Sequence, residues 1–394
     1  MADDIFTDLE GVFGNGISAG IKPNKRDLAY IYVPNAVACA GVFTLNKFIA
    51  PCLTYTQKIM KSQVVKAVII NSGNANAGTG KIGLANAKKT SQHAARLLNL
   101  KPSEVAVAST GIIGVQLPMD KVLSGLDTLL ANASVKEGHA VSDAILTTDL
   151  CDKIVHVSCK IGKKNIVVSG IAKGSGMIEP NMGTMLAYLV TNASIPQAQL
   201  QVILQDACDE SFNMISVDTD TSTNDMALLF ATGEKKFQLV SRVEREAFQN
   251  LLTEACQILA KKIARDGEGA TKLIEVQVVG ASSRRDARKV AKLIVNSPLV
   301  KTAMHGEDPN WGRVLMAAGK DPEVKFSADK LSLFFNEQVI VKEGEIVATR
   351  EQLAPVLKKE TIVILLDLNL GHGRATAWGC DLTNKYIDIN TAYS

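Results

Sequence analysis

The sequence predicts a mixed α/β protein, because short apolar strand segments alternate along the chain with amphipathic helix segments. A strand is expected at Val64–Ile70, followed by a polar loop and then a helix over about 84–98. A second strand is expected at Glu104–Ser109, followed by apolar residues at i, i+4, i+7 and i+8 from Val122, which is the spacing of a helix. At 394 residues the chain is long enough for two or three domains.

The same alternation continues to the end of the chain. A long helix is expected up to Ile263, beginning with Ser241 and Glu244, which have the spacing of a capping box. The other elements expected, by residue range, are strands at Leu28–Val33, Ala36–Thr44, Ile166–Ile171, Leu273–Val279, Lys330–Phe335, Val339–Lys342 and Thr361–Leu366, and helices at Leu200–Ala207, Arg285–Val295 and Gln352–Lys359. There is no internal repeat and no low-complexity stretch.

Composition excludes several classes of protein. The formal net charge of +3 leaves no basic field for nucleic acid. The longest apolar runs, such as Thr361–Leu366, fall far short of the roughly 20 residues that a membrane span requires. The seven cysteines contain no CxxC pair and follow no secretory signal, so we expect reduced thiols and a cytoplasmic location.

The stretch at 173–192 combines a glycine-rich segment with a buried strand. Gly174, Gly176 and Gly183 give the first half backbone freedom, and the run from Thr184 to Thr191 has the pattern of a strand buried on both faces. Thr184 therefore lies at the junction between the glycine-rich segment and the strand, and its side chain is a hydroxyl group. One interpretation is an ordinary turn before a core strand, and the other is a nucleophile that cuts the chain before itself.

Self-cleavage at Gly183-Thr184 would need few other groups. Attack of the Thr184 hydroxyl on the Gly183 carbonyl converts the peptide bond to an ester, whose hydrolysis leaves Thr184 as a new chain terminus. The released α-amino group, with an ordinary pKa of about 7.7 to 8.0, can act as general base without a histidine. Thr110-Gly111, at the end of a predicted strand, offers a hydroxyl and a backbone N–H for an oxyanion hole.

Other motifs carry less weight. The glycines at 78, 80 and 83 match a dinucleotide fingerprint. In that fingerprint the first glycine follows the strand directly, whereas Gly78 lies eight positions after Ile70, the last residue of the preceding predicted strand. The acidic segment 218–225 lacks the glycine and glutamate of a calcium loop. The five histidines are isolated, and no GxSxG motif is present, so neither a metal site nor an ordinary serine hydrolase is expected.

Segments along essentially the whole chain are similar to the ornithine acetyltransferase family, also called glutamate N-acetyltransferase. The central stretch, KGSGMIEPNMGTML at 173–186, resembles the self-cleavage motif of that family. The other matching segments, in family order, are NSGNAN at 71–76, ASTGIIG at 108–114, TTD at 147–149, SVDTDT at 216–221, DGEGA at 266–270, NSPLVKT at 296–302, DPNWGR at 308–313 and GCDLT at 379–383. Gly183 stands where the family more often has alanine.

The resemblance implies roles for named residues. Thr184 would be the nucleophile, the bond after Gly183 the cleavage site, and Thr110 and Gly111 the oxyanion hole. Substrate contacts would come from Thr184 itself and from the positions Thr147 (with Thr148 as the alternative), Lys173, Glu268, Asn390 and Ser394. An ammonium group at position 173 would suit the α-carboxylate of an amino acid, and a carboxylate at 268 would suit an ammonium group. The plainer alternatives are a surface salt bridge for the lysine and a helix-terminating acid for the glutamate.

The same resemblance implies a four-layer αββα sandwich with a C-terminal α/β subdomain from about 283–394. The N-terminal α chain would span 1–183 and the β chain 184–394, and the two would remain together and assemble as α2β2. The expected reaction is ping-pong transfer of acetyl from N-acetylornithine to glutamate in arginine synthesis, with no metal or prosthetic group. Use of acetyl-CoA stays open, as do two alternatives, a self-cleaving amidase and an uncleaved binder of acetylated amino acids.

Overall fold

The computed structural model describes residues 5–61, 64–179, 185–235 and 241–392. It divides the chain into two compact units. The first unit comprises residues 1–174, 180–209 and 220–259, and the second comprises 175–179, 210–219 and 260–394. Strands and helices alternate in both units, which confirms the mixed α/β class expected from the sequence.

The first unit contains two sheets. The four-stranded sheet has the order β1-β2-β4-β5, formed by Phe13–Ile17, Leu28–Tyr32, Ala67–Asn74 and Val105–Ile112. The five-stranded sheet has the order β3-β10-β8-β7-β6, formed by Ala38–Phe43, Met226–Lys235, Leu186–Ala193, Lys164–Lys173 and Lys153–Ile161. In the five-stranded sheet β8 runs parallel to β10 and antiparallel to β7, so the beginning of β8 lies beside the beginning of β10 and the end of β7.

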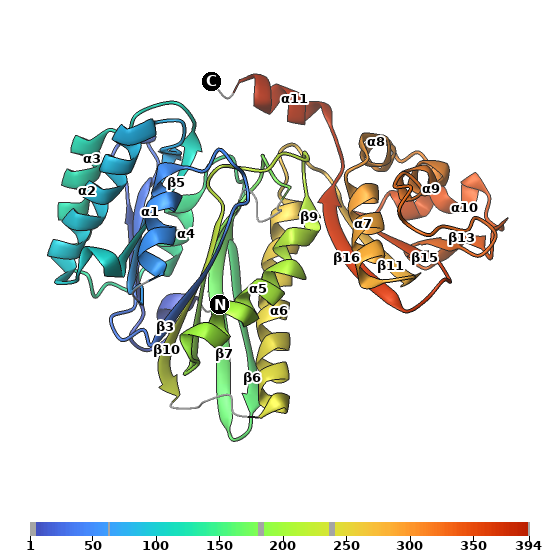
Figure 1. The fold of residues 1–394 in the computed structure, drawn as a ribbon. Coiled ribbons are helices and arrows are strands. Elements are labelled where there is room, and N and C mark those ends of the chain that lie inside the picture. The colour runs from blue at the N-terminus through green and yellow to red at the C-terminus, as the bar shows by residue number, and fades with distance from the viewer. Residues whose placement is uncertain (1–4, 62–63, 180–184, 236–240, 393–394) are drawn as a thin grey trace. The chain divides into compact units, whose positions relative to one another are not determined.

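Helices complete the layers of this unit (Figure 1). They are α1 (Pro51–Met60), α2 (Gly80–Leu98), α3 (Met119–Leu129), α4 (Gly138–Ile145), α5 (Gln197–Asp209) and α6 (Arg242–Arg265), of which α6 continues into the second unit. Side chains of α2 and α3 cover the outer face of the four-stranded sheet. Both sheets share one core, to which α1 and α4 also contribute, while α5 and α6 lie on the other side of the five-stranded sheet.

The edge strand β3 is protected by side chains of α5. Gln197 bonds both backbone groups of Cys39, and Gln201 bonds both backbone groups of Gly41, at distances between 2.8 and 3.1 Å. An edge strand with free backbone groups invites pairing with other chains, and these two amides occupy the groups instead.

Most predicted elements lie where the sequence placed them. Every residue of β8 is buried, which confirms a strand buried on both faces. The capping box of α6 is also confirmed, because the Ser241 and Glu244 side chains bond each other's backbone N–H groups at 3.2 and 2.9 Å. Several boundaries differ from the prediction, most clearly those of β4, which begins at Ala67 and continues through Asn74 into the expected loop, and of α2, which begins at Gly80, four residues before the predicted start.

The second unit is built on a sheet with the order β14-β13-β12-β15-β11-β16-β9. These strands are Glu345–Ile346, Gln338–Lys342, Ser332–Phe335, Thr361–Asp367, Leu273–Ala281, Gly373–Cys380 and Ile215–Ser216. The helices are α7 (Arg284–Val295), α8 (Pro298–His305), α9 (Trp311–Ala318), α10 (Arg350–Leu357) and α11 (Asn384–Thr391). The segment that follows α6, Asp266–Gly269, leads directly into this sheet.

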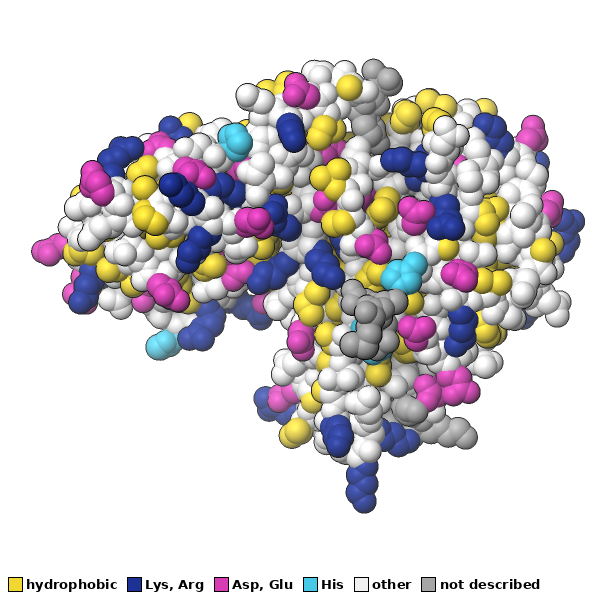
Figure 2. Space-filling model, turned by 180° about the vertical axis from the view of Figure 1, so that it is seen from behind, with side chains coloured by type: hydrophobic (Ala, Val, Ile, Leu, Met, Phe, Trp, Pro, Cys, Tyr) yellow, Lys and Arg dark blue, Asp and Glu magenta, His cyan; other side chains and the backbone are white. Residues whose placement is uncertain are grey.

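The distribution of charged side chains, the cysteines and the helix lengths bear on what the composition predicts. Basic and acidic side chains are intermixed on the face drawn in Figure 2, without a continuous basic field. None of the seven cysteines, all of which lie within the described residues, forms a disulfide bond. None of the helices within the described ranges is long and apolar enough to cross a membrane.

Candidate active site

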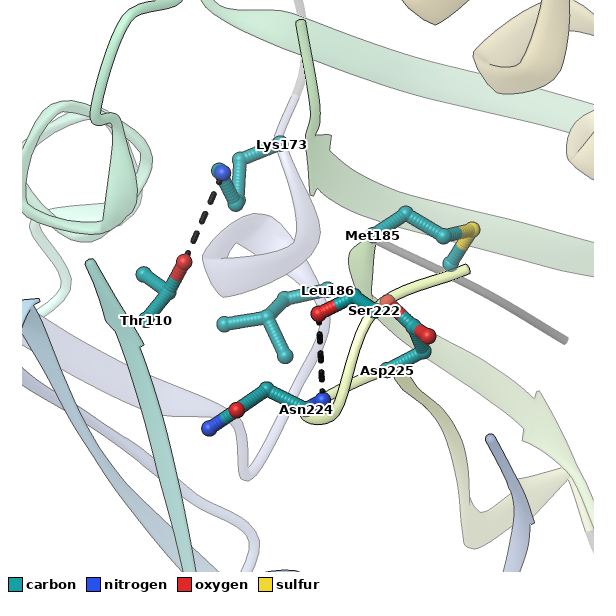
Figure 3. Close-up of a pocket in the computed structure, with 7 residues that line it drawn as sticks. All are labelled: Thr110, Lys173, Met185, Leu186, Ser222, Asn224 and Asp225. Carbon is teal, nitrogen blue, oxygen red and sulfur yellow. Dashed lines mark hydrogen bonds between the residues drawn. The ribbon is translucent and has the colours of Figure 1, made fainter. Parts of the chain in front are cut away.

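A small pocket lies in the first unit where β5, β7, β8 and β10 approach one another (Figure 3). Its lining residues are Thr110, Lys173, Met185, Leu186, Ser222, Asn224 and Asp225. Lys173 is the last residue of β7 and pairs with Leu186, the first residue of β8. Antiparallel pairing therefore places Lys173 beside the beginning of β8, which starts thirteen residues later in the sequence.

The predicted cleavage site adjoins this pocket in the covalent chain. Gly183 and Thr184 lie outside the described residues, as does Ser394. Met185, which is joined to residue 184 by a peptide bond, lines the pocket and accepts a hydrogen bond from Met226 N at 3.1 Å. The pocket is thus lined by the residue that directly follows the predicted nucleophile in the chain.

Thr110 and Gly111 stand at the end of β5, where the backbone allows only glycine. Gly111 has a φ of +131°, and a Cβ added there would lie 2.3 Å from the carbonyl carbon of Gly73 on the neighbouring strand. Gly73 itself has a φ of +90° at an irregularity in the pairing of β4 and β5. A side chain at position 111 is excluded by both conformation and space.

Asn224 holds the segment before β10 against the ends of β4 and β5. Its amide Nδ2 donates to the Ala75 carbonyl at 2.6 Å and to the Ser109 carbonyl at 2.9 Å. Ser222 Oγ accepts a bond from the Asn224 N–H at 3.1 Å, which fixes the turn. The amide therefore joins three segments that are far apart in the sequence, one of which contains the residue before Thr110.

Lys173 is buried and surrounded by oxygen atoms. It is 3% exposed, and its Nζ donates to Thr147 Oγ1 at 2.8 Å and to Thr110 Oγ1 at 3.5 Å. Asp149 Oδ2 lies 3.8 Å from the same nitrogen. Burial of an ammonium group is costly unless it is paired, and these contacts provide the compensation. The structure thus brings together three of the residues assigned from the resemblance.

Asp149 is the anion at the centre of this network. Its side chain is fully buried and bonds Lys153 Nζ at 2.8 Å, while the backbone N–H groups of Gly174 and Thr147 donate to it at 2.6 and 3.0 Å. Burial alone would raise the pKa of Asp149, but Lys173 and Lys153 outweigh that effect and hold the pKa well below its ordinary range. The two lysines and this carboxylate together carry a charge of +1, which favours an anion in the pocket.

Lys22 adds a further cation near Thr147. Its Nζ donates to the carbonyl of Leu146 at 2.8 Å. Burial lowers the pKa of Lys22 to about 8, against the opposing effect of Asp27, and the Lys25 and Lys173 charges lower it further.

Glu268 and Asn390 meet within the second unit. Asn390 Nδ2 donates to Glu268 Oε2 at 2.8 Å. A Cβ added at Gly176 would lie 2.3 Å from Glu268 Cδ, so the glycine leaves room for the carboxylate. The Glu268 N–H donates to the Ser175 carbonyl at 3.1 Å, which fixes this segment. Two residues predicted to contact substrate, 122 positions apart in the sequence, are therefore in direct contact.

Sequence reasoning assigned no role to Asp149, Asn224 or Asp225. Asp149 was noted only as part of a matching segment, and the other two were considered only as part of a rejected calcium loop. A buried carboxylate between two lysines depends on strand pairing, which local patterns do not reveal. Among the residues that the structure describes, no group of three or more histidine, cysteine, aspartate or glutamate side chains could hold a metal ion.

The fold and the pocket define a mixed α/β protein with a buried, positively charged polar network at the beginning of a core strand. Residues 14–394 match the model of the ArgJ family. The chain belongs to this family.

Individual relatives agree with that assignment. The arginine biosynthesis bifunctional protein ArgJ of Dehalococcoides mccartyi is 42% identical over 400 residues, which cover 100% of this chain and 98% of the relative. The protein of the same name from Bacillus thuringiensis is 43% identical over 388 residues, covering 98% of this chain and 95% of the relative. A crystal structure of the arginine biosynthesis bifunctional protein ArgJ from Bacillus halodurans matches with a TM-score of 0.51 and 41% identity, over 53% of this chain and 100% of the solved chain.

Proposed function

We propose that this chain cuts itself between Gly183 and Thr184 and then transfers acetyl from N2-acetylornithine to glutamate through Thr184. The observation that carries the proposal is the pocket beside Met185, in which Lys173 contacts both Thr147 and Thr110. Membership of the ArgJ family supports the same conclusion, because the relatives named above are arginine biosynthesis proteins. The transfer would recycle acetyl in arginine synthesis.

Cleavage would produce an α chain of residues 1–183 and a β chain of 184–394, which remain associated. The length of the solved Bacillus halodurans chain supports two separate chains, since 53% of this chain covers it completely and residues 184–394 are 211 of 394 residues. In the cut, Thr184 Oγ bonds to the Gly183 carbonyl carbon, the C–N bond breaks, and the hydroxyl proton passes to the nitrogen. Water then hydrolyses the ester.

Acetyl transfer would proceed in two half-reactions. The α-amino group of Thr184 takes the hydroxyl proton while Oγ attacks the acetyl carbonyl of N-acetylornithine, and the proton leaves with ornithine. Glutamate then takes the acetyl group by the reverse chemistry. Thr110 and Gly111 would stabilise the oxyanion of each tetrahedral intermediate. The Thr110 hydroxyl lines the pocket, and the backbone at Gly111 tolerates no side chain.

Both substrates carry an α-carboxylate, which Lys173 and Thr147 would bind. Charge supports this assignment. Lys153 and Lys173 together carry two positive charges and Asp149 one negative charge, so the network has a net charge of +1. Glu268 and Asn390 would bind an ammonium group, with Ser394 as a further contact. A carboxylate that already accepts one bond from Asn390 retains acceptor positions for a second donor. Acetyl-CoA as a second donor and an α2β2 assembly are further parts of the proposal.

A denaturing gel and a donor assay test the proposal together. We expect the purified protein to run as fragments of 183 and 211 residues, and Thr184→Ala to run as one intact chain without activity. Ornithine release from N-acetylornithine should depend on glutamate. Release at full rate without glutamate would indicate an amidase, and an intact wild-type chain would indicate an uncleaved binder. Replacing N-acetylornithine with acetyl-CoA determines whether the second donor is used.

A further inference from the structure

Asp225 lines the pocket, and its buried carboxyl group has no hydrogen-bond partner among the residues that the structure describes. It is 1% exposed, and neither of its carboxylate oxygens has a hydrogen-bond partner among the described residues. Figure 3 shows its carboxyl group next to Met185. A buried polar group without a partner costs on the order of 1 to 3 kcal/mol, so its presence needs an explanation.

The strand register places Asp225 level with Met185, the described residue that follows the predicted cleavage site in the chain. Met226 pairs with Leu186 in the parallel ladder of β10 and β8, and the Met226 N–H donates to the Met185 carbonyl. Asp225 is the residue before the first paired residue of β10, and Met185 is the residue before the first paired residue of β8. The next residue outward from Met185 is 184, whose nitrogen is an amide before the cut and an amine after it.

We propose that Asp225 is the positioning partner of the α-amino group that cleavage releases at residue 184. The inference rests on the proposed function and adds a residue to it. No cation is bonded to this carboxyl group among the described residues. Burial raises the pKa of Asp225 well above its ordinary value, against the opposing effects of the Met185 backbone, the Thr44 hydroxyl and the Lys173 charge. Cleavage would supply an amine that can share a proton with this carboxyl group.

The role of this partner during turnover follows from charge. The α-amino group accepts the Thr184 hydroxyl proton as the Oγ–carbon bond to acetyl forms, and it becomes an ammonium group. An ionised Asp225 stabilises that ammonium group and orients the amine toward its own hydroxyl, as a buried aspartate does for the histidine of a catalytic triad. The proton then passes to the nitrogen of the leaving ornithine, and Asp225 is unchanged after each transfer.

The test compares Asp225→Asn with Ser142→Ala. Both variants alter a buried polar group whose side-chain oxygens lack a hydrogen-bond partner within the described ranges, but Ser142 lies in α4 and is not among the lining residues of the pocket. For Asp225→Asn we expect normal cleavage on a denaturing gel, a kcat lower by roughly 100-fold, and KM values within a few-fold of wild type. Ser142→Ala should match wild type in all three.

A pH profile separates positioning from a purely structural role. A carboxylate raises the pKa of a neighbouring amine, so its loss should move the acidic limb of kcat/KM to lower pH. Among the described lining residues, Lys173 is the other charged side chain, and its charge would lower the pKa of the amine. A structural defect alone would lower kcat without moving this limb.

The outcomes distinguish this inference from the proposed function. A kcat for Asp225→Asn within threefold of Ser142→Ala, or an unmoved acidic limb, overturns the role of Asp225 while an active, cleaved wild-type protein still supports the transferase. Failure of Asp225→Asn to cut, with a wild-type melting temperature, also overturns it, because the residue would then act before the amine exists. An uncut or inactive wild-type protein rejects the proposed function itself.

Discussion

Two aspartates in the first unit have the same chemistry and opposite surroundings. Asp149 is buried between Lys153 and Lys173 and accepts backbone hydrogen bonds, whereas Asp225 is buried without a hydrogen-bond partner among the described residues. The pKa of Asp149 is held well below its ordinary range by the lysines despite burial, and that of Asp225 is raised well above it by burial. Burial alone therefore does not determine ionisation; the cations that accompany it do.

The largest expected effect is that of Asp149→Asn. This change leaves Lys153 and Lys173 buried without their carboxylate, which should lower the free energy of unfolding by about 3 to 5 kcal/mol. Urea unfolding measures the loss. The exposed pair of Arg242 and Glu246 provides the control, since Glu246→Gln should cause no measurable change. Equal losses in both variants would contradict the contrast between buried and exposed pairs.

Lys173→Met should have the next largest effect. Asp149 retains Lys153, so we expect a smaller loss in the free energy of unfolding, about 1 to 3 kcal/mol. The KM values for N-acetylornithine and glutamate should both rise, by roughly 10- to 100-fold, because both carboxylates lose the same cation. Steady-state kinetics with each substrate varied in turn tests this. Lys173→Arg keeps the charge and should retain part of the binding, and a rise confined to one substrate would disprove a shared carboxylate site.

Asp225→Asn should not destabilise an uncut chain. In the Thr184→Ala background no amine is released, and replacing a carboxyl group that has no hydrogen-bond partner among the described residues with an amide should lower the free energy of unfolding by no more than about 1 kcal/mol. At neutral pH the substitution should raise it, because the amide removes a carboxyl group whose folded-state pKa is raised by burial. The same Asp→Asn substitution at position 149 in the same background is the matched comparison. A loss at Asp225 as large as the loss at Asp149 would mean that the carboxyl group has a partner in the uncut chain.

The pH dependence of stability should have opposite signs at the two sites. The folded-state pKa of Asp149 is depressed, so its contribution is present above the unfolded value near 3.9 and is lost as the pH falls through the folded pKa. The folded-state pKa of Asp225 is raised, so in uncut protein its contribution is present below about 3.9 and is lost as the pH rises toward the folded pKa. Urea titrations of Thr184→Ala with and without Asp225→Asn, from acidic to neutral pH, measure the second slope, which should disappear in the double variant.

Apolar periodicity predicted the elements whose faces are clearly buried. The long helix α6 was found from apolar positions at helical spacing, and the strand β8 from a nearly uninterrupted apolar run, which is typical of a strand buried on both faces. Short or exposed elements were missed for the opposite reason. In β6 polar and charged residues alternate on a partly exposed edge strand, and α11 has no buried side chain at all.

The residues of the candidate site were predicted in part. The end of a predicted strand indicated Thr110, and resemblance to a family added Thr147 and Lys173. In the structure Lys173 Nζ lies within hydrogen-bond distance of both threonine hydroxyl groups. Nothing local in the sequence indicates that Asn224 ties Ala75 to Ser109, since that contact depends on long-range strand pairing. The carboxyl of Asp225 was missed because a missing partner can only be observed once the fold is known.

The backbone at Gly111 limits how such a site can be redesigned. Any Cβ at this position would meet the carbonyl carbon of Gly73, so substitution cannot add or adjust a donor there. If the pocket accepts an acyl group as proposed, engineering its specificity must work through other lining positions, such as Met185 and Leu186, whose side chains can change size. The backbone conformation therefore fixes Gly111 of the predicted oxyanion hole, and changes in specificity must come from the other residues that line the pocket.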